Sequence, residues 1–233
     1  WMYKFDGDLS KVSNLKYAMG YMPLELNNPE KVLMIGPGGG QDILMGLLAG
    51  VEEITAVEIN QGSVKTAREY ADYNGSIYDR PEVETYIQDG RNFVENNKEK
   101  YDQIYLSLVM TNVADNGGKV LVENYIYTEE AIKEYLKDLN SGGIVSFLMH
   151  DERDLHRLIS TIIDLLLKEG VPKEDIVKRM MVFYKHKKDM IHHPTLVLTK
   201  EPLSYEKSLL FHNKVAKQGY RFLLMPYFHQ KNM

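Results

Sequence analysis

The sequence predicts an α/β protein built on a mostly parallel sheet with helices on both faces. Three observations support this fold class. Strand-like apolar runs alternate with helical segments along most of the chain, without repeats or low-complexity tracts. The first apolar run, 31–35, leads directly into the glycine-rich turn 36–40, a connection that brings backbone close to a ligand. Near the carboxyl end, only a polar loop separates two strand-like runs, so they should pair as an antiparallel hairpin.

The elements of the first half follow from apolar runs and their stop signals. Continuous apolar residues indicate strands buried on both faces. Gly50 and the Asn74-Gly75 pair are typical helix ends. The predicted strands cover 31–35, 53–58, 83–87 and 101–107, and the helices between them cover 41–49, 63–73 and 93–97.

The second half begins with a segment of little periodicity, 108–127, at the place where such folds carry their active-site loop. Thr128 caps the next helix, which ends near Asn140. The remaining predicted strands cover 144–148, 176–184 and 195–199, with a helix over 151–168 and a polar loop over 185–194.

Composition excludes several classes of protein. A length of 233 residues allows one α/β domain with a sizeable core. A net charge of −5 gives no electrostatic footprint for nucleic acid. The chain has no cysteine, which excludes disulfides and thiolate metal sites. Without a signal peptide or an apolar run of 18 residues, the chain as given should be soluble and cytoplasmic.

The ends of the chain indicate a domain cut from a longer protein. The sequence opens at Trp1-Met2 and stops at Met233, just after an apolar stretch. We expect three parts: an N-terminal hairpin or lid over 1–30, a nucleoside-binding domain over 31–202, and a C-terminal helix with a truncated tail over 203–233.

The glycine turn and the acid after the second strand predict a nucleoside ligand. Gly36, Gly38 and Gly40 have the spacing G-x-G-x-G, and Gln41 stands where a dinucleotide fingerprint needs a small residue. This spacing favours S-adenosylmethionine over NAD or FAD. Glu58 ends the second strand, where an acid usually holds a ribose diol. The alternatives are a tight turn without a ligand and a solvated acid at a strand end.

These features together resemble the S-adenosylmethionine-dependent methyltransferase superfamily, and within it the spermidine-synthase-like branch. The resemblance covers about 31–202 and implies a Rossmann-like methyltransferase fold with a seven-stranded, mostly parallel sheet that ends in an antiparallel hairpin. Four segments carry it: Ile35–Gly40, Val57–Asn60, Gln88–Phe93 and Tyr101–Ile104.

The resemblance also implies roles for individual residues. Backbone around Gly36, Gly38 and Gly40 would line the methionine part of the cofactor, and Glu58 would accept hydrogen bonds from the ribose hydroxyls. The other implied contacts are Asp89 and Gly90 with the adenine edge, Ile59 and Leu106 with its faces, and Asp42 with the cofactor's amino group through water. Asp89 could equally cap the helix that follows it.

The sequence departs from the polyamine-forming members of this branch at two places. Their acidic motif after the fourth strand is replaced by 106–109, which reads Leu-Ser-Leu-Val, and the next acids are Asp115 and Glu123. Gly39 stands where their glycine loop carries an aspartate. An amine cation without a buried partner is costly. The departure therefore favours methyl transfer over aminopropyl transfer from decarboxylated S-adenosylmethionine.

Candidates on the acceptor side are weaker. Ser107 could orient an acceptor, Tyr125 could wall its pocket, and His150 could act as a general base. Each also has a purely structural reading. We expect no metal site, because the adjacent His192 and His193 would point to opposite faces of an extended segment.

The expected function is an S-adenosylmethionine-binding transferase domain with an unknown acceptor. One alternative is a non-catalytic nucleoside-binding or regulatory domain, and another is an aminopropyltransferase of polyamine synthesis. The stretch 106–109 with 122–128 resembles spermidine-synthase-like domains found within large multi-pass membrane proteins. This resemblance implies a membrane-embedded remainder of the parent chain, and the branch as a whole implies a possible homodimer.

Overall fold

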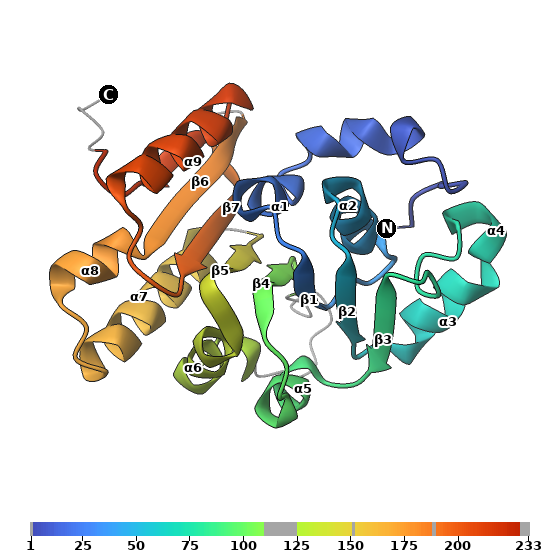
Figure 1. Cartoon of the computed structure of the whole chain (residues 1–233), viewed down its shortest axis with the longest axis horizontal. Helices are drawn as coiled ribbons and strands as arrows, with labels where there is room; N and C mark the ends of the chain where they lie inside the picture. The colour runs from blue at the N-terminus through green and yellow to red at the C-terminus, as the bar shows by residue number, and fades with distance from the viewer. Residues whose placement is uncertain (1, 110–124, 151, 188–189, 229–233) are drawn as a thin grey trace.

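A computed structural model describes residues 2–109, 125–150, 152–187 and 190–228. Its centre is one eight-stranded sheet with the strand order β3-β2-β1-β4-β5-β7-β6-β8 (Figure 1). The strands are β1 (Lys31–Ile35), β2 (Glu53–Glu58), β3 (Val83–Ile87), β4 (Tyr101–Ser107), β5 (Leu139–Leu148), β6 (Met180–Lys187), β7 (Met190–Thr199) and β8 (Arg221–Leu224).

The first five strands are parallel, and the last three complete the sheet with antiparallel pairs. The strand order reverses between β1 and β4. Open α/β sheets bind ligands at such a switch point, outside the carboxyl ends of the strands. The topology therefore indicates a site where the glycine turn leaves β1.

Helices cover both faces of the sheet (Figure 1). One core cluster packs α5, α6 and α7 against the strands, and two others pack η1, α1, α2, α3 and α9 against the opposite face. The helices are η1 (Leu9–Tyr17), α1 (Tyr21–Asn27), α2 (Gln41–Ala49), α3 (Gln61–Glu69), α4 (Ala71–Asn74), α5 (Gly90–Asn96), η3 (Tyr125–Tyr127), α6 (Glu129–Asp138), α7 (Glu152–Lys168), α8 (Lys173–Lys178) and α9 (Tyr205–Lys217).

The predicted α/β class and the predicted bounds of β1 to β4 and α2 are confirmed. Local signals explain this agreement. Gly50 ends α2 in the left-handed conformation, with φ of 84°. Thr128 caps α6 by accepting a hydrogen bond from the Ala131 backbone N–H at 3.3 Å. Within the described residues, no helix is both long and apolar enough to cross a bilayer.

Over 1–30, predicted as a hairpin or lid, the chain forms the helices η1 and α1 and not a hairpin. Its apolar side chains Tyr21, Met22, Leu24 and Leu26 are all buried. Met22 packs in the cluster that contains α9, and Leu24 packs in the cluster that contains α2. The helical conformation allows this burial, because α1 lies between the two clusters and its apolar side chains point into both.

The carboxyl-terminal half differs from the prediction in three further ways. The segment 185–194, predicted as a polar loop, lies mostly in the paired ends of β6 and β7. Residues 173–178, partly predicted as strand, form α8, whose first turn carries Glu174 and Asp175. An eighth strand, β8, pairs with β6 and extends the predicted seven-stranded sheet.

Smaller differences concern helix bounds. The predicted helix 63–73 is two helices, α3 and α4, separated at Tyr70. α5 begins three residues early because Asp89 caps it. β5 begins at Leu139, before the predicted start of this strand at 144. Most of the predicted active-site loop, 110–124 with Asp115 and Glu123, lies outside the described residues.

Candidate functional site

The glycine turn after β1 is held in place by Glu58 at the end of β2. One carboxylate oxygen of Glu58 accepts a hydrogen bond from the Gly38 backbone N–H at 2.8 Å. The other oxygen accepts from the Asn60 N–H, also at 2.8 Å. The Glu58 side chain is only 5% exposed. A carboxylate oxygen accepts more than one hydrogen bond. Glu58 can therefore hold the turn and still accept hydrogen bonds from the hydroxyl groups of a ligand.

The turn itself requires glycine. Gly36, Gly38 and Gly40 all have positive φ, at 73°, 54° and 88°. A Cβ atom at Gly40 would lie 2.6 Å from Ile77, and one at Gly36 would lie 2.9 Å from Val109. At Gly38 a Cβ would meet nothing within 4 Å, so this part of the turn borders open space that a ligand can use. Tyr78 donates a hydrogen bond to the Gly38 carbonyl at 2.6 Å and fixes the turn from the other side.

The residues predicted for the adenine side lie at the carboxyl ends of β2 and β3, with one exception. Ile59 follows Glu58 and is 68% exposed, so its apolar side chain is open to a ligand. Asp89 caps α5 through the Asn92 N–H at 2.9 Å, which confirms the structural alternative for this residue. Gly90 is buried at the start of α5. Leu106 is fully buried in the core, so the structure does not bring it to the site.

A cavity of about 470 Å³ opens at the carboxyl ends of β1, β4 and β5. It brings together Gly36, Gly38, Asp42, Ser107 and His150 from the sequence prediction. The segment 18–20, just before α1, contributes a further wall. Tyr125 does not line this cavity, and its side chain is 58% exposed.

Asp42 is the single carboxylate among the described residues that line this cavity, and no lysine or arginine is among them. It stands in the first turn of α2. The Tyr105 hydroxyl donates a 2.9 Å hydrogen bond to the Gly20 carbonyl and lies 3.4 Å from Asp42 Oδ1. Burial raises the pKa of Asp42 to about 7, while hydrogen bonds from Ser107 and Tyr105 oppose the rise.

The floor of the cavity contains a strained residue. Leu108 has φ of 51°, a left-handed conformation that is costly for a leucine. Its backbone is fixed from two sides: its N–H donates to the Leu148 carbonyl at 2.9 Å, and its carbonyl lies 3.3 Å from His150 Nε2. Such strain is concentrated at functional sites. The contact also positions the His150 imidazole at the cavity.

Sequence reasoning missed His193, which also lines the cavity. The sequence predicts a loop over 185–194, whereas β7 begins at Met190 and carries His193 towards the end of β5. The alternation of His192 and His193 on an extended segment was the available signal. In the described part of the chain, no three His, Asp or Glu side chains gather as a metal site.

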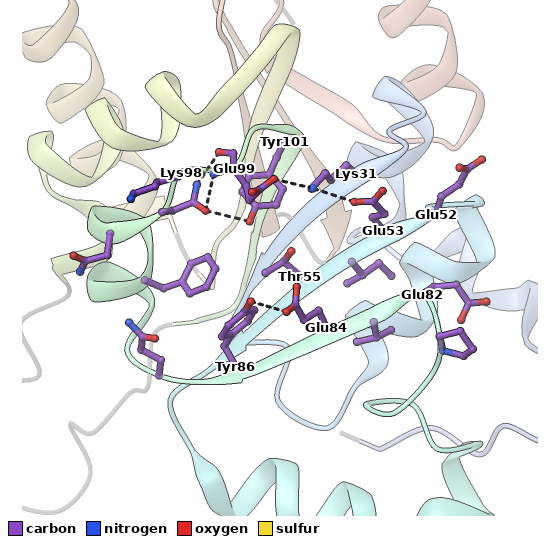
Figure 2. Close-up of a pocket in the computed structure, with 17 residues that line it drawn as sticks. Lys31, Glu52, Glu53, Thr55, Glu82, Glu84, Tyr86, Lys98, Glu99 and Tyr101 are labelled. Carbon is purple, nitrogen blue, oxygen red and sulfur yellow. Dashed lines mark hydrogen bonds and ion pairs between the residues drawn. The ribbon is translucent and has the colours of Figure 1, made fainter.

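A larger cavity of about 760 Å³ lies elsewhere, at the amino ends of β1 and β2 and over one face of β3 (Figure 2). Its acidic walls are partly neutralised, because Lys31 contacts Glu53 at 3.0 Å and Glu99 at 3.2 Å. The Tyr86 hydroxyl donates to Glu84 at 2.6 Å. None of the residues predicted for the nucleoside site lines it. The smaller cavity at the switch point is therefore the candidate site.

Comparisons with known proteins identify the family of the chain. The model of the spermine/spermidine synthase domain matches residues 15–199. The polyamine aminopropyltransferase of Korarchaeum cryptofilum is 33% identical over 123 residues, which cover 52% of this chain and 36% of that protein. The polyamine aminopropyltransferase of Serratia proteamaculans is 34% identical over 143 residues, 58% of this chain and 47% of that protein. The chain thus spans less than half the length of these curated relatives.

Solved structures share the fold at low sequence identity. The spermidine synthase of Thermotoga maritima aligns with a TM-score of 0.60 and 20% identity, over 84% of this chain and 62% of that one. Human methyltransferase-like protein 13 in complex with SAH aligns with a TM-score of 0.54 and 16% identity, over 90% of each chain. These structures support the predicted Rossmann-like fold.

The sequence favours methyl transfer because 106–109 lacks the acidic motif. The two curated relatives named above are polyamine aminopropyltransferases, the activity that the sequence analysis gave as an alternative. The match of the family model over most of the chain identifies its family: the protein belongs to the spermine/spermidine synthase domain family.

Proposed function

We propose that this domain is a transferase that moves the aminopropyl group of decarboxylated S-adenosylmethionine to an amine acceptor. One observation carries the proposal: the glycine turn held by Glu58 borders a cavity in which Asp42 is the single carboxylate, with no lysine or arginine, among the described residues. Such a cavity favours cationic ligands, and both the donor and an amine acceptor are cations.

The residues around the turn fit an adenosyl group. Gly38 leaves open space beside its backbone, and Glu58 keeps acceptor capacity for ribose hydroxyls. Ile59 offers an exposed apolar surface for a purine face. One Asp89 oxygen caps α5, which leaves the other as an acceptor for an exocyclic amine. When bound, a sulfonium donor supplies an electrophilic carbon beside its positively charged sulfur.

The reaction needs positioning more than covalent help from the protein. The acceptor nitrogen forms a bond to the methylene carbon next to sulfur, the C–S bond breaks, and its electron pair stays on sulfur in 5′-methylthioadenosine. The amine must also lose a proton. Asp42, His150 and His193 are titratable groups that line the cavity, and His150 has the orientation fixed by the Leu108 carbonyl.

Methyl transfer from S-adenosylmethionine is the second candidate. The segment 106–109 and Gly39 favour it, because both lack the acids that the polyamine-forming motif carries. The two reactions leave different products, since methyl transfer yields S-adenosylhomocysteine. A domain that binds the donor without turnover is the regulatory alternative.

Calorimetric titration and product analysis test the proposal together. Decarboxylated S-adenosylmethionine, S-adenosylmethionine and 5′-methylthioadenosine are titrated into the wild type, Glu58→Ala and Glu84→Ala. Glu84 is a matched control, because it is an exposed glutamate on the neighbouring strand β3. We expect binding that Glu58→Ala weakens and Glu84→Ala does not.

Turnover is then followed by mass spectrometry with putrescine as the amine. Formation of 5′-methylthioadenosine with an aminopropylated amine supports the proposal. S-adenosylhomocysteine as the product supports methyl transfer instead. Absence of binding by all three adenosyl compounds would overturn the transferase proposal for this chain.

A further inference from the structure

We propose that His150 is the general base of the transfer, and that its Nδ1 atom takes the proton that the acceptor amine must lose. This inference rests on the proposed function and deepens it, because it assigns the proton to one atom of one residue. His150 stands two residues after the end of β5 and lines the cavity of about 470 Å³ at the switch point. Its side chain is only partly buried, so an acceptor in the cavity can reach it.

The contact with Leu108 determines which nitrogen of the imidazole carries the hydrogen. His150 Nε2 lies 3.3 Å from the Leu108 carbonyl oxygen. A carbonyl only accepts hydrogen bonds, so Nε2 must be the donor, and the neutral ring holds its hydrogen there. Nδ1 is left with the lone pair. In this tautomer, Nδ1 is the basic atom of His150 before any substrate binds.

The backbone on both sides of this contact is held in place. The Leu108 N–H donates to the Leu148 carbonyl at 2.9 Å, which keeps the left-handed residue and its carbonyl against the end of β5. Met149, the neighbour of His150, donates its N–H to the Pro194 carbonyl, also at 2.9 Å. Groups of the protein itself therefore orient the imidazole. A general base needs such preorganisation, because it must meet the proton in a fixed geometry.

Three titratable side chains are among the described residues that line the cavity: Asp42, His150 and His193. Asp42 accepts hydrogen bonds from two neighbouring hydroxyl groups, and it stands in the first turn of α2, beside the glycine turn where the proposed donor binds. The His193 ring packs against the His192 ring, with the centroids 4.0 Å apart, and stacking of two rings does not select a tautomer. The contact at His150 assigns both the direction of the ring and the nitrogen that accepts a proton.

The proton moves before the new bond forms. An ammonium nitrogen has no lone pair, so the acceptor must first give one proton to His150 Nδ1, and the ring becomes an imidazolium. The neutral amine then forms its bond to the methylene carbon next to sulfur, and the C–S bond breaks with its electron pair on sulfur. The products are 5′-methylthioadenosine and a secondary ammonium. The Asp42 carboxylate in the same cavity stabilises the imidazolium until it returns its proton to water.

Three variants test the role of the ring. His150→Gln keeps a side-chain N–H for the Leu108 carbonyl but has no basic nitrogen. His150→Ala leaves space that added imidazole can occupy. His156→Gln is the matched control, because His156 is an exposed histidine on α7. Mass spectrometry follows the 5′-methylthioadenosine formed from decarboxylated S-adenosylmethionine and putrescine, calorimetry gives the Kd of 5′-methylthioadenosine, and NMR of nitrogen-labelled histidine reports the tautomer of His150 without turnover.

We expect His150→Gln to lower kcat by about 10²- to 10⁴-fold, the usual contribution of a general base. The Kd of 5′-methylthioadenosine should not change, because that ligand contains no acceptor amine. Added imidazole should raise the kcat of His150→Ala in proportion to its concentration. His156→Gln should keep the wild-type kcat with or without imidazole. The NMR spectrum should place the hydrogen of His150 on Nε2.

Other outcomes separate this inference from the proposed function. If the wild type forms 5′-methylthioadenosine and His150→Gln keeps its kcat, the inference fails while the proposed function stands. A hydrogen on Nδ1 also overturns the inference, because the lone pair would then lie on Nε2, against the Leu108 carbonyl. If both His150 variants weaken 5′-methylthioadenosine binding and imidazole restores no turnover, His150 has a structural role and the inference is overturned. If the wild type forms no 5′-methylthioadenosine, the proposed function itself fails.

Discussion

Replacing Glu58 by glutamine removes one of the two acceptors that hold the glycine turn. The carboxylate accepts from the Gly38 and Asn60 N–H groups, both at 2.8 Å, one through each oxygen. Glutamine has one acceptor oxygen, and its amide nitrogen would face an N–H donor instead. Glu58→Gln therefore loses one charge-assisted hydrogen bond and leaves a backbone N–H without its partner at a position that is 5% exposed.

The expected loss of stability follows from those contacts. A hydrogen bond to a charged group contributes about 1.5–3 kcal/mol, and an unsatisfied buried donor costs a similar amount. Because the loop can relax towards water, we expect a fall of about 2 kcal/mol in the free energy of unfolding. For a domain of this size that corresponds to a decrease of about 4–8 °C in Tm.

The assay is urea unfolding followed by circular dichroism, with Glu84→Gln as the matched control. Glu84 is exposed on β3, and among the described residues it accepts a side-chain hydrogen bond from Tyr86 alone, so its change should stay within about 0.5 kcal/mol. If Glu58→Gln unfolds at the same urea concentration as the control, Glu58 does not hold the turn. The proposal of a preformed donor site would then lose its basis.

Three further predictions address the turn, the cavity wall and the buried acid. Gly40→Ala should lower the free energy of unfolding by about 2–4 kcal/mol in urea titrations, because φ is 88° and the new methyl group would lie 2.6 Å from Ile77. Gly50 is the control, because its φ is similar but a methyl group there would meet no atom within 4 Å. An equal loss of stability in Gly50→Ala would refute the clash with Ile77. Gly20→Ala should weaken donor binding measured by calorimetry, because its methyl group would lie 2.5 Å from the Tyr105 hydroxyl, and Tyr105→Phe in the same chain should restore part of that binding. The pKa of Asp42 is raised to about 7 by burial, so the unliganded protein binds a proton that the unfolded chain releases near pH 4, and stability falls as pH rises from about 4 to 7. Asp42→Asn should accordingly stabilise the protein more at pH 8 than at pH 5, by about 2–3 kcal/mol. Equal stabilisation at both pH values would contradict the raised pKa.

The parallel part of the fold could be predicted from sequence because its signals are local. β1 is a continuous apolar run, and Gly40 and Gly50 set both ends of α2. The same holds for Thr128 at the start of α6. These residues determine their elements through caps and turns that involve only their own neighbours in the chain.

The elements that the sequence did not predict depend on distant partners. β8 forms because β6 offers an unpaired edge, and β7 begins as early as Met190 because β6 pairs with it. α1 is short and contains Pro23, so its helical state follows from burial between two clusters of the core. Periodicity in a short segment cannot report such contacts.

The candidate site shows the same division. Glu58 and the glycines were found because each follows directly from a strand end. Leu106 was misplaced because its side chain alternates into the core, whereas Val109 lies against Gly36. His193 comes from β7, and only the antiparallel pairing with β5 brings that strand to the cavity.

The two acids of the candidate site would respond differently to selection for folding alone. Glu58 holds the glycine turn, so selection for folding alone would retain it. Asp42 carries a buried charge that costs stability in the absence of a ligand. Without selection for binding, mutation would replace it with a neutral residue. Among variants of this domain, retention of Glu58 would therefore say little about ligand binding, whereas retention of Asp42 would indicate selection for it.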